Sequence, residues 1–250
     1  MSKIVVEICC GSAEDVFRAK AAGADRAELN SAVFLGGLTP TIGTVKAAAA
    51  AGLPLMCMLR PRQGGFCYSD TEYEVMLTDA RLMLDAGAAG IVFGFLHEDG
   101  SVDIEKCRGM TEVIGDRESV FHRAIDVVPD WHKAIDQLSD LGLTRILTSG
   151  QQPSVHYGAD TVKQMIEYAA GRIEILPGAG VNLLNAADII ARTGADQIHA
   201  GMSGSKTDSS AAANPSIHFG SPVYPAENVY PVSDEEKIRG LVRQLSIHNS

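Results

Sequence analysis

The stretch Gly142-Leu-Thr-Arg-Ile-Leu-Thr-Ser-Gly150 carries the pattern that decides the fold of this 250-residue chain. Gly142 is typical of a helix end, because the position after a helix favours a left-handed backbone that glycine adopts without strain. Residues 144–148 form a short run rich in β-branched residues, which is typical of strands. Ser149 and Gly150 follow as a turn. We therefore interpret this stretch as a helix end, a strand and the loop after it.

The same pattern recurs along most of the chain. A glycine ends a helical segment and a strand-like run follows, with neighbouring glycines 23 to 35 residues apart. The glycines concerned are Gly23, Gly52, Gly87, Gly115, Gly142, Gly171 and Gly194. Together with an opening run at 4–8, the strand-like runs lie at 26–29, 53–59, 90–93, 120–123, 144–148, 173–176 and 195–199. The sequence thus predicts eight strands.

Helical segments alternate with these strands. We expect helices near 12–22, 40–51, 70–86, 103–114, 130–141, 158–170, 183–192 and 233–246. Strands and helices that alternate at this spacing pair in parallel through right-handed crossovers. Eight such units predict a single-domain α/β protein with a (β/α)₈ TIM-barrel fold spanning 1–250. An open doubly wound sheet is the alternative, but no Gly-x-Gly-x-x-Gly motif follows the first strand.

One segment interrupts the alternation. Residues 203–232 are rich in Ser, Ala, Pro and Gly and show little periodicity. We expect a long irregular loop here, between the eighth strand and the last helix. Loops of that length are usually functional or partly disordered.

Composition limits the partners of the protein. The net charge is −10 and no basic run is present, which argues against nucleic acid because a phosphate backbone would be repelled. No apolar run approaches the length of about 18 residues that a membrane span needs. The five cysteines are an odd number and do not indicate a disulfide framework. Since Glu7 interrupts the first apolar run and no signal-peptide pattern is seen, we expect a cytoplasmic protein.

Polar residues at the carboxyl ends of the predicted strands define candidate catalytic groups, because TIM barrels bind their ligands at that end. Glu7 lies on the first strand, Glu28 on the second, and His122 and Asp126 at the end of the fifth. A general base and a general acid are possible from such a set. The alternative is that the two glutamates form structural ion pairs with arginines, since a buried carboxylate needs a partner.

A second group of residues suits a small anion. The predicted anion-binding residues are Arg60, Arg62, Arg123, Ser149, Gly150, Gly178, Gly180 and His199. Glycine-rich turns expose backbone N–H groups, and arginines add charge-assisted hydrogen bonds. The alternative is that the glycines only allow tight turns.

Cysteine is the natural ligand for Cu(I), because this ion prefers soft thiolates. Cys9 and Cys10 are adjacent on the first strand, so their side chains point to opposite faces and cannot hold one ion together without a local bend. No Cys-x-x-Cys motif is present, which argues against a closed structural metal site. From the residues alone, we expect these cysteines to behave as small buried apolar side chains.

Several blocks together resemble the CutC family over residues 4 to about 200. The blocks are Glu7-Ile-Cys9, Gly23-Ala-Asp-Arg26 with Glu28-Leu29, Gly36-Gly37-Leu-Thr-Pro40, Arg60-Pro-Arg62 with Phe66-Cys-Tyr-Ser-Asp70, Phe121-His-Arg-Ala124 with Asp126, and Leu147-Thr-Ser-Gly150. The resemblance implies a barrel that self-associates, here a homodimer, and a role in copper homeostasis. It also implies Cu(I) ligation by Cys9 and by a second residue after Glu28-Leu29. That second position is Asn30 in this sequence, and asparagine is a poor Cu(I) ligand.

Two main hypotheses for the function follow. The first is a copper-homeostasis protein that binds Cu(I) through Cys9. The second is a metal-independent isomerase, epimerase or lyase for a small anionic or phosphorylated substrate, with acid, histidine and arginine side chains at the barrel mouth. A non-catalytic scaffold is the third alternative.

Overall fold

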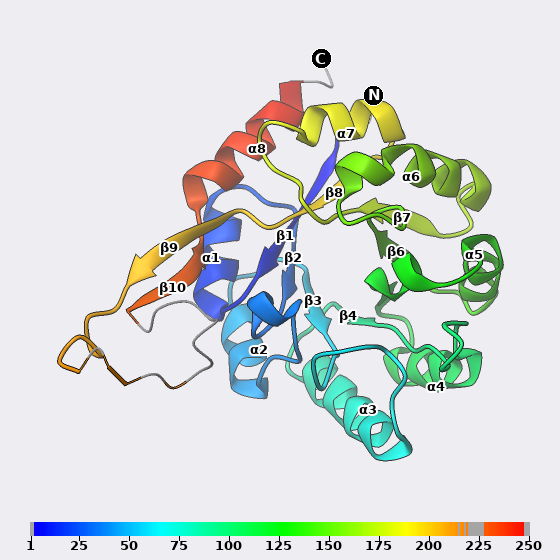
Figure 1. The fold of residues 1–250 in the computed structure, drawn as a ribbon, viewed down its shortest axis with the longest axis horizontal. Coiled ribbons are helices and arrows are strands. Elements are labelled where there is room, and N and C mark those ends of the chain that lie inside the picture. Colours follow the sequence, from blue (N-terminus) through cyan, green and yellow to red (C-terminus); the bar gives the residue numbers. More distant parts are fainter. Residues whose placement is uncertain (1–2, 215, 218, 220–227, 248–250) are drawn as a thin grey trace.

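The computed structural model describes residues 3–214, 216–217, 219 and 228–247. Eight parallel strands stand at the centre of the molecule, and a ring of helices surrounds them (Figure 1). The predicted TIM barrel is thereby confirmed. Among the described residues, none of the helices combines the length and apolar character needed to cross a membrane.

The elements follow the predicted alternation closely. The barrel strands are β1 Val5–Cys10, β2 Arg26–Leu29, β3 Leu55–Met58, β4 Gly90–Phe93, β5 Glu118–Phe121, β6 Arg145–Thr148, β7 Glu174–Pro177 and β8 Gln197–Ala200. The α-helices are α1 Ala13–Ala21, α2 Ile42–Ala49, α3 Asp70–Asp85, α4 Ile104–Ile114, α5 Trp131–Asp140, α6 Val155–Ala169, α7 Ala186–Thr193 and α8 Glu235–Ile247. Two 3₁₀ turns, η1 Val33–Leu35 and η2 Arg123–Val127, follow β2 and β5.

The strands form one nearly closed ring. Hydrogen-bonded neighbours run from β8 through β1 and β2 and onward in sequence order to β7. The ring comes together between β7 and β8, where a Cβ atom built on Gly178 would lie only 3.1 Å from the Cβ of His199. Strands β1 and β8 are hydrogen-bonded to each other, and this pairing places Glu7 beside His199 although 192 residues separate them along the chain.

Side chains alternate between two apolar layers. One face of each strand packs against the helices and forms the main core, which includes Ile8 and Cys10 of β1. The other face points into the barrel, where a smaller apolar cluster consists of Met56, Met58, Val92, Val120, Leu147 and Leu176. Cys9 and Cys10 thus lie on opposite faces of β1, as the strand periodicity predicts.

The segment 203–232 is not an irregular loop throughout, and that prediction is wrong at both of its ends. Strands β9 Ser203–Thr207 and β10 Val229–Ser233 form an antiparallel hairpin that projects from the barrel (Figure 1). Most of the side chains of these strands are exposed, so they lack the alternation of apolar residues by which a strand is recognised. Residues 215, 218 and 220–227 of this segment lie outside the described residues.

Helix α6 packs unusually closely against the loop after β6, and Gly158 makes this possible. A Cβ atom at Gly158 would lie 1.9 Å from the carbonyl oxygen of Ser149. Helix α6 begins at Val155, so this glycine lies inside the helix although the sequence predicts a helix start at 158. The glycine therefore sets the position of the β6 loop next to the barrel mouth.

We predict that Gly158→Ala destabilises the protein by about 2 kcal/mol or more, because the backbone of α6 or of the β6 loop must move to accept the methyl group. Urea denaturation measures the loss. Gly65→Ala is the matched control, since nothing lies within 4 Å of a Cβ there and its φ is not positive. Equal stability of the two variants would contradict the close packing.

Candidate functional site

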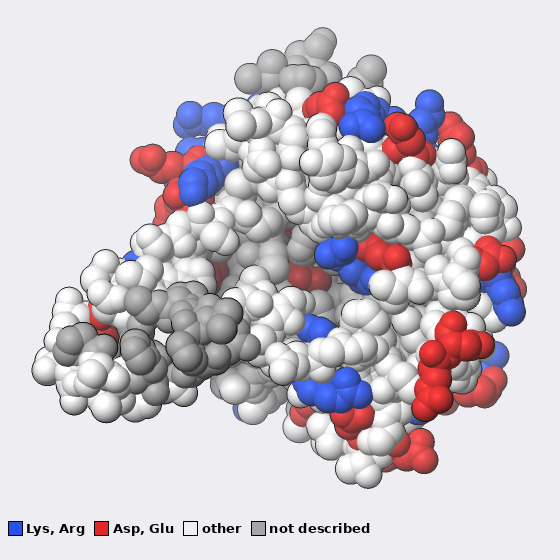
Figure 2. All heavy atoms as spheres, viewed as in Figure 1, with Lys and Arg blue, Asp and Glu red and all other residues white. Residues whose placement is uncertain are grey.

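A cavity of about 460 Å³ opens at the carboxyl ends of the barrel strands. Figure 2 shows a hollow near the centre of this face, with acidic and basic side chains around it. Its lining residues are Cys9, Glu28, Asn30, Val33, Gly36, Gly37, Met58, Arg60, Phe66, His122, Arg123, Leu147, Ala179, Gly180, His199 and Gly201.

Glu7 lies beneath this cavity and holds two cationic groups. One carboxylate oxygen is ion-paired with Nε of Arg26 on β2. The other lies 2.7 Å from Nδ1 of His199 on β8. All three residues are buried. Glu7 thus joins three neighbouring strands and also determines how the imidazole ring of His199 is oriented.

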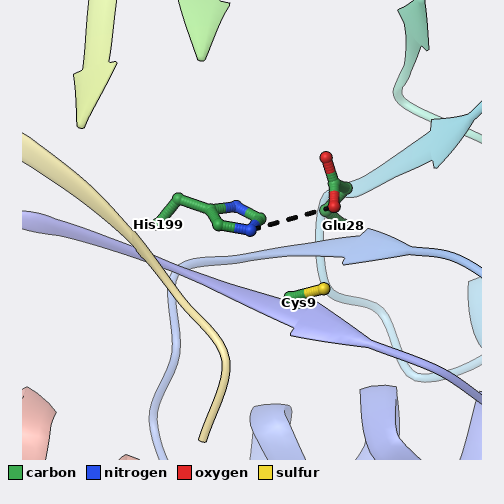
Figure 3. A group of neighbouring side chains, drawn as sticks. All are labelled: Cys9, Glu28 and His199. Carbon is green, nitrogen blue, oxygen red and sulfur yellow. Dashed lines mark ion pairs between the residues drawn. The ribbon is translucent and has the colours of Figure 1, made fainter. Parts of the chain in front are cut away.

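Three side chains above Glu7 face one another at the cavity wall. Cys9 of β1, Glu28 of β2 and His199 of β8 each offer one ligand atom, and these atoms lie within 4.8 Å of one another. Figure 3 shows them pointing into a common space, with the ion pair between His199 and Glu28 dashed. Nε2 of His199 is 3.9 Å from Oε2 of Glu28. We call these three residues the mouth triad.

Asn30 borders the mouth triad from the end of β2. Its Nδ2 donates to Oε2 of Glu28 at 2.7 Å and also reaches Sγ of Cys9 at 3.5 Å. Two buried oxygens, Oε1 of Glu28 and Oδ1 of Asn30, have no hydrogen-bond partner among the described residues. Glu28 and Asn30 therefore each hold an unpaired acceptor oxygen, buried beside the cavity that both residues line.

The pKa values of the two glutamates shift in opposite directions, and those of Cys9 and His199 are both raised. Burial raises the pKa of Glu28, and the charge of Glu7 adds to the rise. Burial also raises the pKa of the Cys9 thiol. Burial opposes ionisation of Glu7 as well, but His199 and Arg26 outweigh it and lower the pKa of Glu7 to about 2. Although burial disfavours its charge, the acidic neighbours raise the pKa of His199 well above its usual range.

His122 lies at the end of β5 on another part of the cavity wall. Its Nδ1 accepts a hydrogen bond from the backbone N–H of Ala124 at 3.2 Å. Burial, followed by the positive charges of Arg60 and Arg123, lowers the pKa of His122 to about 3. The ring is therefore neutral at physiological pH, and its proton resides on Nε2 because Nδ1 is an acceptor.

Arg60 follows β3 and is a buried cation. Its two terminal nitrogens donate to the backbone carbonyls of Leu35, Gly37 and Gly64 at 2.8 to 3.2 Å. Within the described residues it has no ion pair with a carboxylate, and its Nε has no hydrogen-bond partner. Arg60 shapes the loops around the cavity and carries an uncompensated charge at the cavity wall.

Asp126 is fully engaged in the loop that follows β5. It pairs with Arg123 at 2.8 Å and accepts hydrogen bonds from Thr148, from Gln151, and from both the backbone and the hydroxyl of Ser149. It does not line the cavity. Asp126 therefore fastens the β5 loop to the β6 loop and leaves no free oxygen for acid–base chemistry.

The structure brings together part of the predicted site. The residues at the cavity wall are Cys9, Glu28, Arg60, His122, Arg123, Gly180 and His199, with Glu7 directly behind His199. The backbone N–H groups of Ser149, Gly150 and Gly178 already donate within the protein, to Asp126 and Thr148. Arg62 lies outside the cavity lining and pairs with Glu72 at 2.5 Å.

Sequence reasoning gave no site role to two contributors, Arg26 and Phe66, and discounted a third, Asn30, as a poor Cu(I) ligand. Arg26 pairs with Glu7, Asn30 supplies an amide beside Cys9, and Phe66 packs against His122 with ring centroids 4.7 Å apart. Strand alternation could have identified Arg26, because it lies two residues before Glu28 on the same face. No pattern in the sequence signals Phe66, because it lies in a loop.

The fold and the site define a single barrel with a cysteine, an acid and a histidine at its mouth, and the comparisons with known proteins agree on its family. The model of the CutC family matches residues 4–204. A CutC family protein of Treponema denticola is 49% identical, over 98% of this chain and 100% of its own length. The human copper homeostasis protein cutC homolog is 37% identical, over 95% of this chain and 87% of its own.

A solved structure supports the same assignment. The crystal structure of CutC from Streptococcus agalactiae is 34% identical, with a TM-score of 0.75, and the match covers 78% of this chain and 97% of that one. This chain therefore belongs to the CutC family, and its curated relatives from human and mouse carry the name copper homeostasis protein cutC homolog. The resemblance noted in the sequence is confirmed.

We predict that His122 makes the protein less stable as the pH falls from about 6.5 toward 3. The unfolded chain takes up a proton on this histidine below its usual pKa of about 6.5, whereas the folded chain does not until about pH 3. The contribution of His122 to the free energy of unfolding should fall by about 1.4 kcal/mol per pH unit through this window, and the difference between wild type and a variant without this histidine isolates that contribution. Urea denaturation at several pH values between 7 and about 5 measures it, above the range in which Glu7 contributes.

His122→Asn should lose this pH dependence, because an asparagine oxygen can still accept from Ala124 but does not titrate. His132→Asn is the control, since the side chain of His132 is 54% exposed. A wild type and a His122→Asn variant with equal pH dependence would show that His122 is not held neutral.

Proposed function

We propose that this protein takes part in copper homeostasis by binding one Cu(I) ion as cargo at the mouth triad. The observation that carries the proposal is the convergence of Sγ of Cys9, Nε2 of His199 and a Glu28 oxygen within 4.8 Å of one another. The unpartnered oxygens of Glu28 and Asn30 support it. Two unpaired acceptor oxygens close together suit a cation.

The orientation of His199 also favours a metal ion. Its Nδ1 is 2.7 Å from the Glu7 carboxylate, so an ion that displaces the proton from Nε2 would leave a neutral ring with its proton held on Nδ1. A carboxylate that orients a ligating histidine in this way is common at metal sites in proteins. Thiolate and imidazole suit Cu(I), and the Glu28 carboxylate would add negative charge beside them.

Asn30 departs from the cysteine pair that the family resemblance implies. In this chain the second soft ligand would be His199, which the linear pattern does not place near Cys9. The mixed set of sulfur, nitrogen and oxygen ligands would bind Cu(I) less tightly than two thiolates. We therefore expect Cu(I) to bind with moderate affinity, which allows the ion to be released again.

We predict that the protein binds one Cu(I) per chain and that Cys9→Ser reduces the affinity at least about 100-fold, because the only thiolate in the site is lost. Competition with a chromophoric Cu(I) chelator under reducing conditions measures it. Cys67→Ser is the matched control, because Cys67 is the exposed cysteine of the chain and lies outside the cavity lining. His199→Asn keeps a donor for Glu7, removes Nε2 and should weaken binding. Equal Cu(I) affinity of wild type and Cys9→Ser would overturn the proposal.

We further predict that Asn30→Cys strengthens Cu(I) binding at least about tenfold. The Asn30 amide lies 3.5 Å from Sγ of Cys9, so a thiolate at this position can share one ion with Cys9. The same chelator competition measures the gain, and Asn30→Ser controls for loss of the amide. Unchanged affinity in Asn30→Cys would show that Cu(I) does not bind between these two positions.

A further inference from the structure

We propose that the barrel cavity also binds a small organic carboxylate, whose two oxygens accept hydrogen bonds from Nε of Arg60 and Nε2 of His122. This carboxylate site lies on the β3 and β5 side of the mouth and uses none of the mouth triad. Carboxylate binding is therefore a separate property that does not depend on copper binding. A cavity of about 460 Å³ is far larger than one metal ion needs, and it falls in the range of small-molecule sites.

Arg60 is the charge that the carboxylate would neutralise. The residue is 8% exposed, and no acidic side chain pairs with it in the described part of the chain. Buried charges are normally paired, because leaving water without a counter-charge is costly. Three backbone carbonyls accept hydrogen bonds from the terminal nitrogens, and Nε of this cavity-lining side chain has no hydrogen-bond partner among the described residues.

His122 supplies the second donor. It is 3% exposed, and Nε2 has no hydrogen-bond partner among the described residues. Because Nδ1 accepts from the N–H of Ala124, the neutral ring carries its proton on Nε2. Phe66 packs against both residues, with its ring centroid 5.5 Å from Cζ of Arg60 and 4.7 Å from the ring of His122. The two donors therefore belong to one wall.

The arrangement favours a carboxylate over a phosphate group. Two single donors match the two oxygens of a carboxylate, whereas a phosphate dianion needs more donors. The backbone N–H groups of Ser149, Gly150 and Gly178, which would suit a phosphate, are already used within the protein. The remaining wall includes apolar side chains of Val33, Met58 and Leu147, which suit a hydrocarbon group attached to the carboxylate.

Binding of simple carboxylates to the metal-free protein tests the proposal. The probes are benzoate, hexanoate and pyruvate, with benzamide as the uncharged partner of benzoate and inorganic phosphate as the competing anion. Isothermal titration or ligand-observed NMR should give saturable binding of at least one carboxylate, with benzamide at least about tenfold weaker than benzoate where benzoate binds. Cys9→Ser should bind the carboxylate as wild type does, so failure of copper binding and failure of this site are distinguishable.

Two substitutions locate the site. His122→Asn keeps the acceptor for Ala124, removes Nε2 and should weaken the carboxylate about tenfold. Arg60→Met should abolish binding, whereas Arg62→Met, which removes the same charge two residues away and outside the cavity, should not. The melting temperature of each variant shows whether it is folded, so that a loss of binding is not confused with a loss of folding. If Arg60→Met does not fold, the carboxylate affinity of His122→Asn still tests the assigned donors.

Several results would overturn the proposal. One is the absence of saturable binding for all three carboxylates, and another is equal affinity for benzoate and benzamide. Tighter binding of phosphate than of any carboxylate would overturn the choice of ligand class. A carboxylate affinity that Arg62→Met lowers as much as Arg60→Met, or that His122→Asn leaves unchanged, would overturn the assigned donors.

Discussion

The pairing of buried Glu7 with Arg26 and His199 is the constraint on which the rest of the site depends. A carboxylate that is 2% exposed is stable only with counter-charges or donors, and both partners come from neighbouring strands. This requirement fixes the register of charged side chains across β8, β1 and β2. It also orients the imidazole of His199 toward Glu28 and Cys9. The mouth triad is thus a consequence of neutralising one buried acid.

The barrel interior is divided between ionic and apolar packing. From Glu7 and Arg26 the polar contacts continue through Gln197 to Glu174 and Arg145, near the opposite end of the strands. The inward residues of β3 to β7 include the apolar cluster around Met56 and Val92. The two buried glutamates near the carboxyl ends of the strands, Glu7 and Glu28, therefore lie on the β1 and β2 side, and apolar side chains lie beside them.

One cavity thus contains two walls of opposite character. Glu28 and Asn30 hold unpaired acceptor oxygens on one wall, and the wall formed by Arg60, Phe66 and His122 offers hydrogen-bond donors and a positive charge. A cation and an organic anion are the complementary occupants, and each would leave the other's ligands free. Acid–base chemistry on such an anion, with Glu28 or His199 as the base, remains a hypothesis from the sequence, and it would use the same two walls.

The sequence by itself determined the eight-fold alternation, the opposite faces of Cys9 and Cys10, and the presence of Glu7, Glu28 and His122 at strand ends. These follow from local rules, because helix-ending glycines and side-chain periodicity act over a few residues. These rules did not predict the β9–β10 hairpin, because most side chains of its two strands are exposed and show no alternation of buried and exposed residues. Only the tertiary structure decided that His199 lies beside Cys9 and Glu28. It also decided that the oxygens of Asp126 are all hydrogen-bonded, mainly to the loop after β6, and that Arg62 lies outside the cavity. Those outcomes depend on how the ring comes together and on which buried charge finds which partner, and contacts between residues so distant in the chain leave no periodic trace in it.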